Sequence, residues 1–202
     1  MERPGRRWLW WAVALSGVVV AACGSDDKPT SGVTIETLAA ATGTACPVAF
    51  EVSADNSGID TPTPATGSVV VGHPDITAAA GSSPSLSPID AADGVIVTCS
   101  VQLADGPLEL MLVAAHTEAA TELLLPEAAR VGKLSTNQAT QLANDAARTE
   151  PGELVPFPGS EAVAMMPTKV KGASSAALLV SADGLKRAQV EQVARQLDER
   201  LR

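Results

Sequence analysis

Two apolar runs in the middle of the chain alternate with polar residues and are separated by a turn signal. Residues 95–103 place Val, Val, Cys, Val and Leu on one face, and Thr, Ser and Gln on the other. A period of two residues is the pattern of a strand with one buried face. The run 107–113 follows Asp105-Gly106, and Asp-Gly between two β-rich runs favours a tight turn. We therefore predict a β-hairpin with Cys99 on its core face.

Helical periodicity is clearest at the carboxyl end of the chain. There apolar residues recur at steps of three and four, and they are Leu185, Val190, Val193, Ala194, Leu197 and Leu201. This repeat predicts an amphipathic helix, with Asp183 as its amino-terminal cap. Helix-forming composition predicts three further helices, over 34–41, 117–125 and 136–148. Pro126 is expected to end or divide the helix 117–125.

Short β-rich runs predict the remaining strands, over 46–52, 68–71, 161–166 and 173–181. Segments rich in Pro, Gly, Ser and Asp, over 55–67 and 77–93, have the composition of loops. Strands paired as meanders with helices packed on one face indicate an α+β fold. We expect a single domain over 33–202, with a mainly antiparallel sheet of about five to six strands and a C-terminal amphipathic helix.

The amino terminus carries a different signal. Three arginines precede the apolar run Leu9–Val20, which is shorter than the roughly 20 residues of a membrane-spanning helix. Val20-Ala21-Ala22-Cys23 then has the pattern of a lipobox, with small residues before a cysteine that offers a thiol for lipid attachment. The sequence predicts a signal peptide over 1–22, cleavage between Ala22 and Cys23, and a flexible Gly/Ser/Pro-containing tether over 23–32.

This segment resembles bacterial lipoprotein precursors, whose cysteine is diacylglycerylated on sulfur before cleavage. The resemblance implies a diacylglyceryl anchor on Cys23, and two acyl chains give stable attachment to a membrane. The expected location is the extracytoplasmic face of the cell membrane. An ordinary secretory signal with a chance cysteine is the alternative. Export by the general secretory route is favoured, although Arg6-Arg7 also fits a twin-arginine signal loosely.

The layout of the whole chain carries a second resemblance. A lipobox, a short helix, Ala45-Cys46-Pro47, a second cysteine in a mid-chain strand, the segment Val170–Ala177 and a closing helix occur in this order. The order is similar to that of small exported lipoproteins of high-GC Gram-positive bacteria. The shared motifs imply no catalytic residue.

Composition and charge exclude some functions. All three tryptophans precede Cys23, and the only later aromatic residues are Phe50 and Phe157, so platforms for stacking sugars or bases are scarce. Residues 23–129 contain fourteen Asp and Glu against Lys28 alone, whereas residues 130–202 contain eight acids and ten bases. This acidic balance argues against nucleic acid as a partner.

The cysteine count supports export. With Cys23 assigned to the lipid, only Cys46 and Cys99 remain, and an exported protein meets oxidising conditions. We predict a disulfide between them. Neither cysteine lies in a Cys-x-x-Cys motif, which disfavours a catalytic or metal-binding role.

Motifs of catalysis and metal binding are weak throughout the chain. Hydrolase, metalloprotease and nucleotide-binding signatures are absent from the sequence. His73 and His116 are far apart and are interpreted as surface or structural histidines. Residues 55–60 depart from a calcium loop at Ile59 and lack its closing Glu. Met165-Met166 is interpreted as core filling. We therefore expect no metal, no cofactor and no enzymatic activity.

Three functional hypotheses follow. The first is a non-enzymatic envelope lipoprotein that binds a protein partner or a small apolar ligand. The second is a carrier of a lipid or another amphiphile, which needs an apolar cavity of several hundred Å3 between sheet and helices. The third is a hydrolase with an unrecognised site, which needs a polar cleft that joins a histidine to a serine and a carboxylate.

Overall fold

The computed structural model describes residues 33–41, 45–48, 66–71, 94–103 and 106–202, and for 66–71 it describes the backbone alone. These residues belong to the unit Ser31–Arg202. The lipobox, the tether, His73, Phe50 and the segment 55–60 lie outside the described residues.

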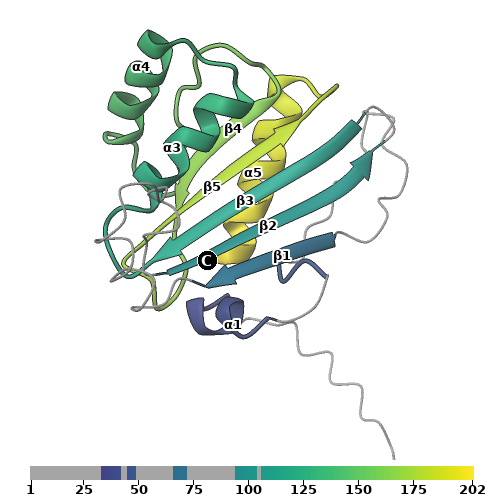
Figure 1. Cartoon of the computed structure of the whole chain (residues 1–202), viewed down its shortest axis with the longest axis vertical. Helices are drawn as coiled ribbons and strands as arrows, with labels where there is room; N and C mark the ends of the chain where they lie inside the picture. Colours follow the sequence, from purple (N-terminus) through teal and green to yellow (C-terminus); the bar gives the residue numbers. More distant parts are fainter. Residues whose placement is uncertain (1–32, 42–44, 49–65, 72–93, 104–105) are drawn as a thin grey trace, which may run out of the picture. The chain divides into compact units, whose positions relative to one another are not determined.

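The centre of the unit is an antiparallel sheet (Figure 1). Its strands are β1 (Thr66–Val71), β2 (Gly94–Leu103), β3 (Gly106–Ala115), β4 (Val163–Thr168) and β5 (Ser175–Ala182), in the order β1-β2-β3-β5-β4. The α+β class with an antiparallel sheet is as expected. Four of these strands, β2 to β5, are described with their side chains, which is fewer than the five to six expected. The remaining strand, β1, is described by its backbone alone and pairs with β2 at the edge of the sheet.

The central hairpin forms as its alternation predicts. β2 and β3 pair from Gly94 opposite Ala115 to Leu103 opposite Gly106. Gly106 has a φ of +141°, which a residue without a Cβ adopts at little cost. Gly106, the second residue of the Asp-Gly signal, therefore lies at the start of β3, opposite Leu103.

The second half of the sheet is not a simple meander. β5 pairs with β3 on one side and with β4 on the other, antiparallel in both cases. β3 and β4 consequently run parallel to each other with β5 between them, and the helices α3 (Ala120–Val131) and α4 (Thr136–Ala146) make the crossover. This is a split β-α-β arrangement.

Helices cover both faces of the sheet, which corrects the expectation of one covered face (Figure 1). On one face α1 (Ile35–Ala39) and α5 (Arg187–Leu201) pack against alternate residues of β2, β3, β4 and β5. On the other face α3 packs against β3, β4 and β5, and α4 packs against α3. The reason is that β4 and β5 are apolar at nearly every position, the pattern of strands buried on both sides.

Two helix boundaries differ from the local expectations. α3 continues through Pro126, although an interior proline removes a backbone hydrogen bond and costs about 3 kcal/mol. Burial of Leu123, Leu124 and Ala128 on the same helix offsets that cost. α5 begins at Arg187 rather than near Asp183, because the Gln189 side chain accepts a hydrogen bond from the Lys186 backbone N–H (2.9 Å).

The other predicted elements are close to their expected places. Thr34 caps α1, whose Ile35 and Leu38 are buried, and Ser135 caps α4 through a reciprocal bond with Gln138. The strand expected over 46–52 is not formed at residues 46–48, and residues 49–52 lie outside the described chain.

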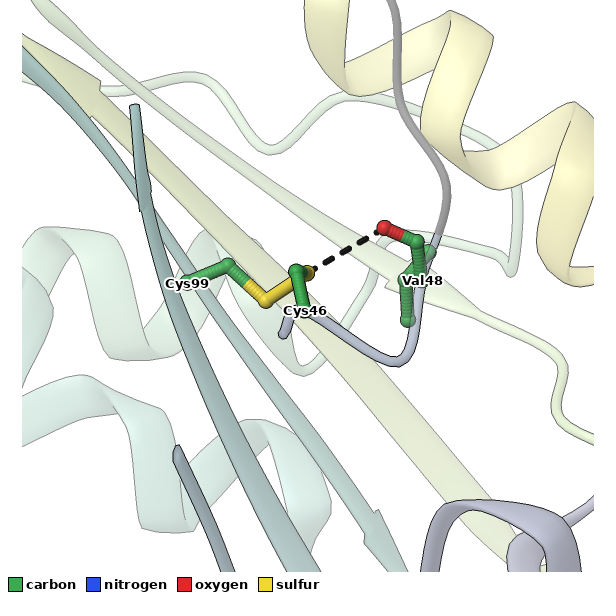
Figure 2. The surroundings of a disulfide bond; sticks show 3 residues. All are labelled: Cys46, Val48 and Cys99. Carbon is green, nitrogen blue, oxygen red and sulfur yellow. Dashed lines mark hydrogen bonds between the residues drawn. A yellow bond between two sulfur atoms is a disulfide. The ribbon is translucent and has the colours of Figure 1, made fainter. Parts of the chain in front are cut away.

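The disulfide between Cys46 and Cys99 is present, as predicted, with Cα atoms 5.5 Å apart (Figure 2). The buried Cys99 lies on the α5 face of β2, and the bond holds the segment 45–48 against that face. The Cys46 sulfur lies 3.1 Å from the carbonyl oxygen of Val48, which is itself buried. The staple therefore attaches the amino-terminal part of the unit to the core.

Candidate functional site

A cleft of about 750 Å3 opens where β4 ends and β5 begins. Its walls come from the loop 169–174 between these strands, from the end of α5 and from the segment 149–151. These three pieces are distant in sequence, and they meet because α5 packs against β4 and the segment 149–152 is hydrogen-bonded to Pro167 and Arg202. The volume is in the range of small-molecule sites.

Cationic and hydroxyl side chains dominate the polar lining of the cleft. The polar side chains are those of Lys169, Lys171, Arg202, Thr121, Thr149, Thr168, Ser174 and Ser175. Among the residues that the structure describes, no Asp or Glu belongs to the lining, although the whole chain has 23 acidic against 14 basic residues. The composition of the cleft therefore departs from that of the protein, and favours a ligand with hydrogen-bond acceptors.

The rest of the lining is apolar. It consists of Pro151, Pro167, Val170, Ala173, Ala176 and Leu201, together with Gly172. Val170, Ala176 and Leu201 also belong to the core on the α5 face. The cleft thus joins an apolar floor that is continuous with the core to a polar, cationic lining.

A buried polar network fixes the wall formed by α5. Asp198 is 6% exposed and Thr168 is 3% exposed, and the Thr168 hydroxyl donates a hydrogen bond to Asp198 Oδ1 at 2.5 Å. Asp198 Oδ2 lies 2.9 Å from Arg202 Nε, and Arg202 Nη2 donates to the Pro151 carbonyl at 3.0 Å. The buried carboxylate is therefore paired, as a buried charge requires. One chain of contacts connects β4, α5 and the segment 149–151.

The close approach of Arg202 depends on Gly152. Gly152 has a φ of +97°, and a Cβ placed there would overlap the Arg202 guanidinium. Gly152 also donates its N–H to the Pro167 carbonyl at 2.8 Å, and Val155 donates to the Met165 carbonyl at 2.9 Å. These bonds cover part of the outer edge of β4, which is exposed to pairing in an edge strand.

The amino-terminal segment of the unit meets the cleft at Lys171. The Ile35 N–H donates to the Lys171 carbonyl at 2.9 Å, and the Lys171 N–H donates to the Val33 carbonyl at 3.2 Å. A backbone bridge therefore fixes residues 33–35 to the loop that lines the cleft.

Glu36 lies beside this bridge and outside the lining. A hydrogen bond from its own backbone N–H, followed by one from Thr34, lowers the pKa of the exposed Glu36 carboxylate, and the charges of His116 and Lys171 add to the effect. Lys171 thus has a carboxylate neighbour. Lys169 forms no ion pair within the part of the chain that the structure describes.

Ser175 does not resemble a catalytic serine. Its hydroxyl donates to the Thr117 carbonyl at 2.6 Å and accepts from the Ala120 N–H at 3.0 Å, so it anchors the start of α3. His116 is exposed after the end of β3, and among the described residues no hydrogen bond joins it to a serine.

Met165 and Met166 are fully buried on opposite faces of β4, so each fills one of the two cores as predicted. Within the described ranges, no group of three or more His, Cys, Asp or Glu side chains is placed to hold a metal ion. In the same ranges, no helix combines the length and apolar character needed to cross a membrane.

Sequence reasoning did not find the residues of the cleft. Lys169 and Lys171 lie between the strands expected over 161–166 and 173–181, where the sequence has no motif of a binding site. Asp198 lies beside the apolar stripe of α5, and nothing in a helical repeat distinguishes it from a solvated residue. The excess of cations after residue 130 was the one signal that pointed toward this half of the chain.

Comparison with protein-family models, with curated protein sequences and with solved structures finds no match to this chain.

Proposed function

We propose that this protein is a cell-envelope lipoprotein, held on the extracytoplasmic face of the membrane by a diacylglyceryl group on Cys23. We further propose that it is not an enzyme and that it binds a small ligand in the cleft between β4, β5 and α5. The observation that carries the binding proposal is the cleft of about 750 Å3, whose lining combines an apolar floor with cationic and hydroxyl groups.

This lining favours a small amphiphilic ligand over a purely apolar one. Lys169, Lys171 and the hydroxyls would lose hydration to an apolar ligand without gaining hydrogen bonds, and such desolvation is unfavourable. An amphiphile can instead place its apolar part on Val170, Ala176 and Leu201.

A carrier that encloses a whole lipid receives less support. Leu112, Leu178 and Leu197 are fully buried between the sheet and α5, and Met165, Ala177 and Leu124 are fully buried on the α3 face. Among the described residues, such packing favours a ligand in the cleft at the end of the sheet over one enclosed between the sheet and the helices.

A protein partner remains as the second candidate from the sequence. A partner that adds a strand to the sheet needs free backbone groups at an edge. At the cleft these groups are engaged, because the N–H groups of Lys171, Ala173 and Ser174 donate to backbone carbonyls. Recognition there relies on side chains, which favours a small ligand.

Anchoring is tested by Cys23→Ala in the producing cell. We expect the variant to lose its acyl groups, measured by mass spectrometry, and to leave the membrane fraction or accumulate as the precursor. Unchanged processing and membrane retention would contradict the anchor.

Ligand binding is tested by amine-reactive labelling of the mature protein in intact envelopes and after purification. We expect Lys169 and Lys171 to be labelled more slowly in envelopes, because a ligand covers them. Lys186 is the matched control, an exposed lysine at the other end of the 15-residue α5, about 22 Å away along the helix. Equal labelling of Lys169 in both preparations would count against an occupied cleft.

A further inference from the structure

We infer that the cleft recognises an oxyanion of the phosphate type, presented by a lipid headgroup at the membrane surface or by a free phosphate ester. This inference rests on the proposed function and names the chemistry of its ligand. Three observations carry it: the charge of the lining, the state of its donors, and the position of the cleft relative to the attached end of the unit.

The charge of the lining is positive, and the two lysines provide that charge. Arg202 is paired with Asp198, so its charge is balanced within the protein. Lys171 has Glu36 as a neighbour outside the lining, and Lys169 has no carboxylate partner among the described residues. Both lysines are exposed and line the cleft, and no Asp or Glu belongs to its described lining, whereas the Glu36 carboxylate lies beside the lining residue Gly172. An anionic group placed at Lys169 would therefore gain attraction, while Glu36 offsets part of the attraction of Lys171.

The donors that remain for a ligand are side-chain donors. Lys169 and Lys171 have ammonium groups, and the exposed Ser174 adds a hydroxyl. Ser175 and Thr168 already donate to Thr117 and Asp198. Ammonium and hydroxyl donors suit a compact group with several acceptor oxygens, which describes a phosphate better than a planar amide.

The apolar part of the lining allows the same cleft to bind an amphiphile that carries a phosphate. Val170, Ala173 and Leu201 line the same cleft as the two lysines. A phosphate ester with a glycerol or short acyl part can place its phosphate at the lysines and its carbon atoms on this floor. Inorganic phosphate would use the lysines alone and is expected to bind more weakly.

The position of the cleft links it to the membrane. Residues 33–35 are hydrogen-bonded to Lys171, and the proposed anchor Cys23 lies ten residues before Val33. Ten residues span at most about 35 Å when fully extended, so the proposed anchor on Cys23 would keep Val33, and Lys171 bonded to it, within about that distance of the membrane surface. The acids of residues 23–129 outnumber the bases by thirteen, so the cationic cleft is distinct from the acidic half of the chain.

Binding is tested on the mature lipoprotein in neutral detergent micelles. The probes are inorganic phosphate and glycerol 1-phosphate, with heats measured by titration calorimetry. We expect glycerol phosphate to bind, and we expect Lys169→Gln/Lys171→Gln to weaken that binding about tenfold or more, because hydrogen bonds to charged groups are strong. Lys186→Gln is the control and should bind as the unmodified protein does.

The source of the phosphate is tested in lipid nanodiscs. The mature lipoprotein is reconstituted with phosphatidylcholine alone, or with phosphatidylcholine and phosphatidylglycerol, and amide hydrogen exchange is followed over residues 169–176. Slower exchange with phosphatidylglycerol, lost in the double lysine variant, supports a lipid headgroup. Binding of glycerol phosphate without this slowing supports a free phosphate ester.

Absence of lysine-dependent binding in both the micelle and the nanodisc experiments would overturn the oxyanion site. Lysine labelling separates this outcome from failure of the proposed function. If Lys169 is labelled more slowly in envelopes but the purified protein does not bind phosphate, the cleft holds a different ligand, such as an acidic protein segment. If Lys169 is labelled equally in both preparations and no phosphate binds, then both the small-ligand proposal and the oxyanion proposal fail.

Discussion

The interior of this protein consists mainly of buried apolar side chains, whereas the cleft also presents exposed polar and cationic side chains. In the interior, nearly every side chain of β4 and β5 is buried under a helix, α5 on one face and α3 on the other. At the cleft, residues 169–174 leave the sheet, and lysine and serine side chains stay exposed. Stability and the proposed binding are therefore expected to be separable, because they depend on different residues of adjoining segments.

The largest expected effect concerns the interior. Leu178 is fully buried on the α5 face, so Leu178→Ala should lower the free energy of unfolding by roughly 3–5 kcal/mol. Lys169→Gln in the cleft should change it by about 0.5 kcal/mol or less. Urea denaturation followed by circular dichroism measures both. Similar losses in the two variants would remove the distinction between interior and cleft.

Loss of the disulfide should come next. Cys46 and Cys99 are 53 residues apart, and removal of such a bond by Cys46→Ser/Cys99→Ser should cost about 2–4 kcal/mol. Because neither cysteine lines the cleft, binding of glycerol phosphate should survive at temperatures where the variant is folded. Non-reducing mass spectrometry of the exported protein supplies the control. Two free thiols there would contradict the bond as a feature of the mature protein.

Asp198 lies on the boundary between the two regions. Asp198→Ala removes the acceptor of the buried Thr168 hydroxyl and the partner of Arg202, so we expect a loss of about 1–3 kcal/mol in unfolding free energy. We also expect weaker ligand binding, because Arg202 and Thr168 line the cleft. Glu199→Ala, at the exposed neighbouring position, is the matched control. Equal stability of the two variants would show that the network contributes little.

The smallest effect should be a pH dependence at Glu36. Folding lowers the pKa of its carboxyl from 4.5, chiefly through hydrogen bonds from its own backbone and from Thr34, so the folded state favours the charged form. The resulting stability is present above pH 4.5 and is lost as the pH falls through the lower folded pKa. Glu36→Gln should therefore reduce Tm slightly at pH 7 and leave it unchanged in strong acid. A difference that grows as the pH falls would have the wrong sign.

Local patterns predicted much of the fold. Alternation identified the hairpin and placed Cys99 on the core face, and a count of cysteines identified its partner Cys46. Helix-forming composition placed the starts of the helices expected over 34–41 and 136–148 within one residue of the observed starts of α1 and α4. These features depend on neighbours in sequence, which is why a single sequence reveals them.

Features that depend on distant contacts were not predictable in the same way. The second covered face arises from pairing of β5 between β3 and β4, and short apolar runs do not reveal that order. Pro126 indicated a helix end, and tertiary packing of α3 overrode it. The cleft depends on a bond between Thr168 and Asp198, 30 residues apart, and on the bridge from Val33 to Lys171.

The central claim is that the cleft binds a ligand at the membrane, and photo-crosslinking in living cells tests it most directly. A photoreactive amino acid replaces Ser174 in the cleft or Lys186 at the opposite end of α5. We predict a discrete adduct with the mass of a phospholipid or of a smaller phosphate ester at position 174, identified by mass spectrometry of the intact protein, and none at position 186. Equal adducts at both positions, or none at position 174, would contradict the account.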